Sequence, residues 1–289
     1  MARKRRIDLE GGIHHVMNRG VDRRNVFFGD DDRSEFGRRL ADIHERFGVE
    51  TLAYCLMGNH YHLLLRAVDG NLPDAMHHLG TTYVRRTNDR IGRDGPLFRG
   101  RYHSILVTTD AYLTWATRYI HRNPLDLASV AAPADYRWSS YRSYLGLRPS
   151  PSFLNAGMVL DLFADAAEFI EFTEQRSASM FVGEQISLDD IRQLVEFSIS
   201  NDNLTDCDSR GANAPWLSRT ILVLLATGDL DAAVRGEVER HLGFPSTDAR
   251  RMAVARARQR WHADPAAQRI LAAVSGYLDP EFQGRTECA

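Results

Sequence analysis

Residues 58–67 read GNHYHLLLRA, and this stretch holds the pattern from which the rest of the chain can be organised. Gly58 and Asn59 form a two-residue hairpin signal between two apolar runs. Side chains on a strand alternate between its faces. One side therefore carries His60, His62, Leu64 and Arg66, and the other carries the core-like set Tyr61, Leu63, Leu65 and Ala67. The stretch therefore predicts the second strand of a hairpin with two imidazoles on one face.

Strand-like and helix-like patterns alternate on both sides of this hairpin. Phe36, Leu40, Ile43 and Phe47 recur at helical spacing, and Asn123-Pro124 ends a later helix. Helices placed between antiparallel strands predict an α+β fold of ferredoxin-like character with a central antiparallel sheet. In chain order the expected elements are strand 12–19, helix 31–47, strands 49–57 and 60–67, helix 72–90, strand 105–107 and helix 110–122.

The second half of the chain reads as mostly α-helical. Pro149-Ser150-Pro151 is a plausible boundary, which predicts a domain at 1–148, a helical linker region at 149–214 and a helical domain at 215–289. A polar loop is expected at 201–214. The expected helices cover 154–174, 188–198, 217–226, 230–242 and 248–261.

Composition and charge restrict the classes of protein considered. The first 150 residues carry 23 Lys+Arg against 17 Asp+Glu, a balance of +6, and the remainder carries 13 against 21, a balance of -8. A basic half favours a polyanionic partner. Three cysteines without a CxxC pair argue against a disulfide framework and a cysteine zinc site. No apolar run approaches the roughly 20 residues of a membrane helix, and the basic N-terminus lacks an apolar signal core. We expect a cytosolic protein.

The paired histidines have two interpretations. Two imidazoles at positions i and i+2 on one strand face can converge on one metal ion. They can equally be two half-exposed polar residues. A metal site needs further ligands, so the choice depends on other segments.

The expected helix 110–122 offers such groups. Tyr119 and Asn123 are four residues apart and so lie on one helical face. A phenol can attack phosphorus once a cation neutralises the phosphate, and an amide oxygen can ligate that cation. The alternative is an apolar stripe packed in the core. Tyr112 is the rival nucleophile, but Ala116, four residues after it, cannot ligate anything.

Four blocks in this order carry a family resemblance: MGNHYHLLLR, PLFRGRYHSILV, YLTWATRYIHRNP and YRWSSYRSYLG. Over about residues 8–147 the chain resembles the single-tyrosine HUH transposases, and in particular the REP-associated tyrosine transposases. The resemblance implies a ferredoxin-like HUH fold. It also implies that His60 and His62, with Asn123 as third ligand, bind a divalent metal, Mg²⁺ or Mn²⁺.

The resemblance further implies that Tyr119 attacks single-stranded DNA, forms a 5′-phosphotyrosine link and leaves a free 3′-OH. Because transesterification keeps the phosphodiester energy, no ATP is required, and no GxxxxGK[ST] loop is present. His103 and His121 are candidates for a general base, with surface or packing roles as the alternative.

Arginines near these blocks predict a DNA surface. Gly95 and Gly100 would let the Gly-rich loop approach a phosphate, and Phe98 and Tyr102 could stack on unpaired bases. Alternatively, the arginines form a solvated face with local acidic partners. We expect DNA contacts from Arg19, Arg23, Arg85, Arg86, Arg99 and Arg101, with Arg24, Arg90 and Arg93 nearby.

Residues 215–277 are faintly similar to the DNA-binding domain of the bacterial replication initiator DnaA, which implies a helix-turn-helix. The acidic balance of this half makes a protein–protein or structural role an equal alternative. For the whole chain the leading hypothesis is a metal-dependent transposase acting on single-stranded or hairpin DNA, as a monomer or homodimer. The alternatives are a hairpin-binding regulator that does not cut and a metal-dependent hydrolase unrelated to DNA.

Overall fold

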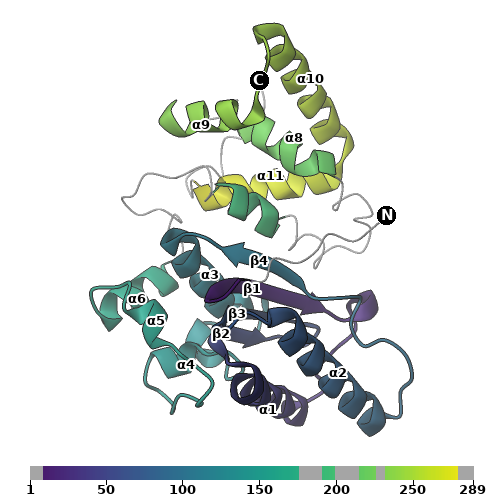
Figure 1. Cartoon of the computed structure of the whole chain (residues 1–289), viewed down its shortest axis with the longest axis vertical. Helices are drawn as coiled ribbons and strands as arrows, with labels where there is room; N and C mark the ends of the chain where they lie inside the picture. Colours follow the sequence, from purple (N-terminus) through teal and green to yellow (C-terminus); the bar gives the residue numbers. More distant parts are fainter. Residues whose placement is uncertain (1–8, 176–190, 199–214, 226–231, 279–289) are drawn as a thin grey trace. The chain divides into compact units, whose positions relative to one another are not determined.

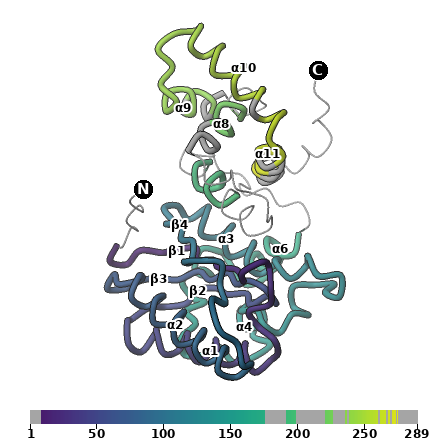
Figure 2. The backbone as a smooth tube through the Cα atoms, turned by 90° about the vertical axis from the view of Figure 1, so that its right-hand side faces the viewer, coloured from purple at the N-terminus to yellow at the C-terminus, as the bar shows by residue number. Residues whose placement is uncertain are grey.

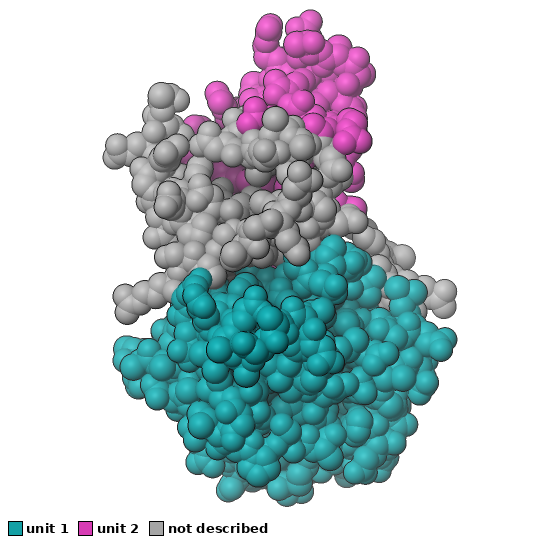
Figure 3. Space-filling model, turned by 90° about the vertical axis from the view of Figure 1, so that its left-hand side faces the viewer, with its two compact units in different colours: residues 1–175 teal, residues 176–289 magenta. Residues whose placement is uncertain are grey.

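A computed structural model describes residues 9–175, 191–198, 215–225 and 232–278 of the chain. Contacts divide the chain into two compact units, Met1–Gln175 and Arg176–Ala289, which Figure 3 shows in different colours. The boundary expected after residue 148 lies inside the first unit.

The first unit is built on a four-stranded antiparallel sheet. Its strand order is β2-β3-β1-β4, so β1 and β3 are central. Helix α1 joins β1 to β2 and α2 joins β3 to β4, which is the ferredoxin-like order and confirms the expected fold (Figure 1). The elements are β1 Gly12–Arg19, α1 Asp30–Phe47, β2 Val49–Leu56, β3 His60–Ala67, α2 Leu72–Ile91 and β4 His103–Val107.

Helices α1 and α2 cover one face of the sheet and form the main core there. Phe36, Leu40 and Ile43 of α1 recur at helical spacing and are fully buried. They pack with alternate residues of the strands, including Tyr61 and Leu63 of β3. Alternation along β3 thus commits one set of its side chains to this core.

The opposite face of the sheet is covered by α3, Asp110–Arg122. Figures 1 and 2 both show α3 across the sheet from α1 and α2. The Thr109 side chain caps the start of α3 by accepting from the Tyr112 backbone N–H. The helix ends where Asn123-Pro124 begins the short 3-10 helix η2, Asn123–Asp126, so the predicted bounds are confirmed.

The expected long helix 154–174 is wrong. The chain forms two short helices there, α5 Gly157–Leu160 and α6 Ala166–Glu174. Asp165 accepts from the Glu168 backbone N–H, which makes a new helix start in the middle of the expected one. Residues 139–147 contain the short helix α4, Tyr141–Tyr144, and 133–135 the 3-10 turn η3.

The described part of the second unit is helical, as expected. Its core joins apolar residues of segment 191–198 and of the four helices that follow. Gly243 at φ +59 ends α9, and the Ser246 side chain caps α10. The helices are α8 Pro215–Leu225, α9 Ala232–Leu242, α10 Thr247–Ala263 and α11 Pro265–Leu278.

Two expectations for this unit are not tested. The expected polar loop 201–214 lies outside the described residues. A DNA-binding role for α9 and α10 stays a prediction. Within the described ranges, no helix is long and apolar enough to cross a membrane.

Candidate active site

His60 and His62 lie on the face of the sheet that α3 covers. In the register of β1 and β3, Arg19 faces His60 and Met17 faces His62, so these side chains share one side. Tyr61 points to the other side and packs in the core with Phe36. The alternation expected from the sequence therefore places both imidazoles together, with ring centroids 5.2 Å apart.

The connection before β3 differs from the expected two-residue turn. Residues 57–59 join β2 to β3, and neither Gly58 nor Asn59 has the positive φ that a type I′ turn requires. Instead, their carbonyl groups bind the segment after β1: Gly58 accepts from Val26 and Asn59 accepts from Gly20. This tertiary pairing overrides the local turn signal.

Gly20 permits that close approach. A Cβ at this position would lie 2.0 Å from the Arg24 carbonyl oxygen. Because Gly20 N–H donates to the Asn59 carbonyl at 2.8 Å, it ties the end of β1 to the start of β3. The backbone around His60 is thus held from two strands.

Helix α3 brings Tyr119 and Asn123 to the two histidines. Asn123 Oδ1 lies 3.0 Å from His60 Nε2, and Asn123 Nδ2 donates to the Tyr119 hydroxyl at 3.2 Å. The Tyr119 ring stands nearly perpendicular to the His62 ring, with centroids 5.3 Å apart. The four side chains singled out from the sequence are therefore in mutual contact.

His60 has an unusual hydrogen-bonding environment. Burial lowers its pKa to about 4, the hydrogen bond to Asn123 opposes this, and nearby Arg19 lowers the pKa further, so the ring is neutral at pH 7. A neutral ring carries one N–H, yet an amide oxygen lies at each nitrogen: Asn59 Oδ1 at 2.7 Å from Nδ1 and Asn123 Oδ1 at 3.0 Å from Nε2. In one of these two contacts, therefore, a nitrogen lone pair faces an amide oxygen with no hydrogen between them.

His15 is a third histidine at this site, and the sequence reasoning missed it. It lies on β1, is fully buried, and its Nε2 is 3.2 Å from His62 Nδ1. Its Nδ1 is 3.3 Å from the Tyr112 hydroxyl. His15 and Arg19 are four residues apart on one strand, so the sequence indicates that they share a face. The sequence does not indicate the register of β1 against β3, which places His15 beside His62.

The two candidate tyrosines of α3 occupy different environments. Tyr112 is fully buried, whereas Tyr119 is partly exposed. Trp115 lies between them and stacks on both rings at centroid distances of 5.5 Å. The Tyr119 hydroxyl contacts Asn123, while the Tyr112 hydroxyl contacts His15.

The other two histidines considered from the sequence are His121 and His103. His121 is fully buried on α3, and its Nε2 is 2.8 Å from Ser140 Oγ. Burial lowers its pKa to about 3, which is typical of a packing histidine. His103 begins β4 opposite Met17 and is partly exposed.

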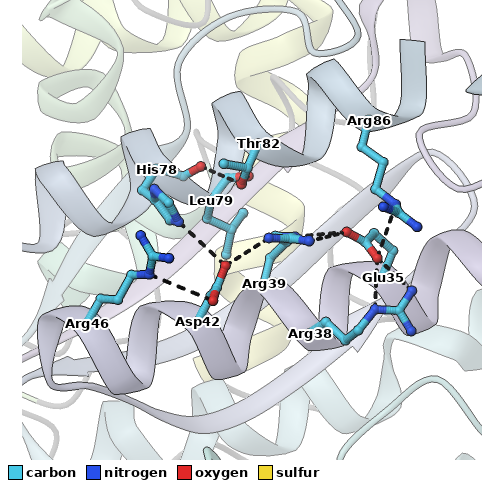
Figure 4. A network of polar contacts seen from close by, with 9 residues as sticks. All are labelled: Glu35, Arg38, Arg39, Asp42, Arg46, His78, Leu79, Thr82 and Arg86. Atoms are coloured by element: carbon cyan, nitrogen blue, oxygen red, sulfur yellow. Dashed lines mark hydrogen bonds and ion pairs between the residues drawn. The ribbon is translucent and has the colours of Figure 1, made fainter. Parts of the chain in front are cut away.

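The arginines expected to contact DNA divide into three groups. Arg19 is 3% exposed and lies beside His60, which differs from the surface position expected. Arg86 pairs with Glu35 of α1 in the network that Figure 4 shows. Arg86 is nevertheless exposed, as are the remaining members, Arg23, Arg85, Arg99 and Arg101.

Phe98 and Tyr102 are not exposed stacking platforms. Each is 9% exposed and belongs to the core on the α1–α2 face. Both nevertheless line an open cavity of about 500 Å³ together with Arg85 and Arg101. The Gly-rich loop thus contributes its charges to a hollowed surface and its rings mostly to packing.

These features, a ferredoxin-like sheet with paired histidines facing a helix that carries a tyrosine and an amide, define a class of site that can act on phosphodiesters. Residues 10–123 match the family described as IS200-like transposases. Over this segment the first unit is therefore similar to the IS200-like transposases. No curated protein sequence matches the chain significantly.

A comparison with solved structures finds a REP-associated tyrosine transposase bound to a REP hairpin. The sequence identity is 14%, the match covers 62% of this chain and 100% of that chain, and the TM-score is 0.44.

Proposed function

We propose that the first unit cleaves and rejoins single-stranded DNA through a covalent 5′-phosphotyrosine intermediate on Tyr119. The observation that carries the proposal is the contact chain from the Tyr119 hydroxyl through the Asn123 amide to His60 Nε2. These two contacts bring the proposed nucleophile, Tyr119, and two proposed metal ligands, Asn123 and His60, within hydrogen-bonding distance of one another. The family match supports a DNA substrate.

His60, His62 and Asn123 are the proposed ligands of a divalent cation, Mg²⁺ or Mn²⁺. Adjacent ligands of an octahedral Mg²⁺ at about 2.1 Å lie about 3.0 Å apart, and His60 Nε2 and Asn123 Oδ1 are 3.0 Å apart. A cation between them would relieve the conflict of two acceptors. His62 Nε2 is buried and has no hydrogen-bond partner among the described residues, which suits a ligand nitrogen.

Amide and imidazole groups carry this site, rather than a cluster of acidic residues. In the described ranges, no group of three or more His, Cys, Asp or Glu side chains is arranged to hold a metal ion. A neutral ligand set leaves the full charge of a bound cation to polarise the scissile phosphate. It also explains why the third ligand would be an amide oxygen.

The protein groups have defined parts in the reaction. The Tyr119 oxygen attacks phosphorus, the bond from phosphorus to the 3′ oxygen breaks, and the 5′ phosphate stays on the tyrosine. The phenol loses a proton and the departing 3′ oxygen gains one, so the step is neutral overall. Asn123 Nδ2 holds the Tyr119 oxygen in place, and the buried Arg19 adds positive charge beside His60.

A single chain supplies all four side chains, so we expect a monomer to be competent. Arg85 and Arg101, at the cavity of about 500 Å³, are proposed to hold the DNA strand or hairpin. We also propose a cytosolic location, because chromosomal DNA is the expected substrate.

A covalent-trapping assay tests the proposal. Purified protein is mixed with labelled single-stranded hairpin DNAs and Mn²⁺ or Mg²⁺, and the products are separated on a denaturing gel. We expect a shifted band that needs metal and retains the label only when the label lies 3′ of the cut. Hairpins that are retained on a native gel but never linked, across the whole pool, would instead support a regulator that binds without cutting.

A further inference from the structure

A chain of hydrogen bonds runs from α3 through β1 to the paired histidines of β3. The Tyr112 hydroxyl lies 3.3 Å from His15 Nδ1, and His15 Nε2 lies 3.2 Å from His62 Nδ1. All three side chains are fully buried. The chain ends at His62 Nε2, which is buried and has no hydrogen-bond partner among the described residues.

Only two proton arrangements satisfy this chain with neutral rings. In the first, His62 Nδ1–H donates to His15 Nε2, and His15 Nδ1–H donates to the Tyr112 oxygen, which leaves His62 Nε2 as a bare lone pair. In the second, the Tyr112 hydroxyl donates to His15 Nδ1, and His15 Nε2–H donates to His62 Nδ1. The second arrangement puts the remaining proton on His62 Nε2.

The two arrangements differ in cost. A buried N–H without an acceptor loses the hydrogen bond that it makes to water, which costs about 1–3 kcal/mol. A bare nitrogen lone pair in the same place is a weaker loss and becomes a ligand when a cation arrives. In the first arrangement the Tyr112 hydroxyl proton must find another acceptor, and it can do so by rotating about the C–O bond. A proton on His62 Nε2 is fixed in the ring plane and has no acceptor among the described residues, so the surroundings of His62 favour the first arrangement.

His60, the other histidine of the pair, also has a hydrogen-bond partner at Nδ1, and there the partner is Asn59. His60 Nδ1 lies 2.7 Å from Asn59 Oδ1, an acceptor that places the proton on Nδ1 and leaves Nε2 toward Asn123. Each of the paired histidines thus has at Nδ1 a partner that can accept a proton, and this contact leaves its Nε2 available. Partners of this kind orient metal-binding histidines in proteins generally.

We propose that His15, held by the Tyr112 hydroxyl, is a positioning residue that fixes His62 in the Nδ1–H tautomer and so keeps Nε2 bare for the cation. This inference rests on the proposed function, because it concerns the same metal site. It assigns a role to two buried side chains of the site that are neither the nucleophile nor ligands.

Metal binding by the full-length chain gives the first readout, with Mn²⁺ titrated calorimetrically in the absence of DNA. His15→Leu removes the acceptor for His62 Nδ1 and should weaken Mn²⁺ binding by about 10- to 100-fold. His15→Gln places an amide oxygen near the position of Nε2 and should restore most of the affinity. Tyr112→Phe should weaken binding less than His15→Leu does, because it leaves His15 Nε2 in place.

His14 provides a matched control. It is adjacent in sequence and buried, but it faces the other side of the sheet, where its Nδ1 contacts Ser104 Oγ at 3.2 Å. His14→Gln should leave the Mn²⁺ affinity within about 2-fold of wild type while perturbing the fold comparably. Thermal unfolding of each variant identifies any protein that has lost its structure.

The tautomer itself gives the second readout and needs no metal. Long-range ¹H–¹⁵N correlation spectra of the metal-free protein should show the His62 proton on Nδ1, and this signal should be lost or shifted in His15→Leu. A proton on His62 Nε2, or unchanged Mn²⁺ affinity in a folded His15→Leu, would overturn the inference. If wild type shows the Nδ1–H tautomer and binds no Mn²⁺, the metal site of the proposed function fails and the positioning role of His15 stands.

Discussion

The two faces of the same four-stranded sheet serve different purposes. The face under α1 and α2 is a continuous apolar core in which Phe27, Phe36, Tyr61 and Tyr83 pack ring against ring. The face under α3 carries imidazoles, an arginine and an amide where it meets Tyr119. Because strand side chains alternate, β3 supplies both faces, and each histidine of the site is followed or preceded by a core residue.

The difference shows how a small domain holds polar groups in a buried site. The aromatic core fixes the register of β3, and that register sets where His60 and His62 stand. On the other face, burial lowers the pKa values of His15, His60 and His62, which keeps them neutral at pH 7. The apolar core thus stabilises the fold. Its contribution offsets the free-energy cost of burying polar side chains on the other face.

The largest effect is expected from Tyr119→Phe on the polar face. Removal of the hydroxyl should reduce DNA cleavage on the order of 10³-fold or more, because no other group can form the covalent link. DNA binding should persist, since the ring and its stacking on Trp115 remain. Cleavage and binding are measured on the same hairpin. Tyr112→Phe is the paired variant and should still form the adduct when Mn²⁺ is raised, whereas loss of the adduct only in Tyr112→Phe would reverse the assignment.

The stability of the first unit should depend more on the core face of the sheet than on its polar face. Phe36→Ala on the core face should lower the free energy of unfolding by about 3–5 kcal/mol, because it leaves a cavity among Phe27, Tyr61 and Tyr83. His60→Ala on the polar face should change it by no more than about 1 kcal/mol. Urea unfolding followed by tryptophan fluorescence gives both values. Equal losses in the two variants would mean that the faces do not divide their roles as described.

Acid should destabilise the first unit through its buried histidines. The unfolded chain takes up protons as pH falls through about 6.5, whereas His121 in the folded state does so only near 3. Stability from this group is therefore fully present above pH 6.5 and is lost as pH falls toward 3, with a slope of about 1.4 kcal/mol per pH unit. Unfolding free energies at pH 7 and pH 5 measure this slope.

His121→Phe isolates one contribution to that slope without touching the candidate site. The variant should unfold with a shallower pH dependence than wild type between pH 6.5 and 5. The same dependence in both proteins would show that His121 is protonated in the folded state within this range.

The smallest effect is expected at the exposed arginines. Arg85→Ala and Arg101→Ala should each reduce the slope of log K against log salt for single-stranded DNA by about 0.7. Arg86→Ala should change it less, because Glu35 already pairs with that guanidinium. Fluorescence anisotropy at several salt concentrations resolves the three variants. A larger effect for Arg86 than for Arg85 would move the DNA surface toward α1.

Local patterns predicted the first unit well. Alternation identified β1 and β3 with their observed bounds, helical spacing identified α1 and α2, and Asn123-Pro124 located the end of α3. Strands and helices of this kind depend on periodicity, which is a property of the sequence itself. The antiparallel sheet followed from the order of the elements.

The features that were missed depend on tertiary contacts. The turn at Gly58-Asn59 is opened by hydrogen bonds from Gly20 and Val26, and the helix expected at 154–174 is divided by the cap at Asp165. Arg19 and Phe98 were placed on the surface because their neighbours are polar, yet both are buried. His15 became visible only when the register of β1 against β3 was known.

The most direct measurement of the central claim is the identity of the residue joined to DNA. The trapped adduct is digested with protease and nuclease, and the peptide that retains a nucleotide is sequenced by mass spectrometry. We predict a nucleotide attached through its 5′ phosphate to Tyr119. Attachment to Tyr112 or to any other residue would contradict it.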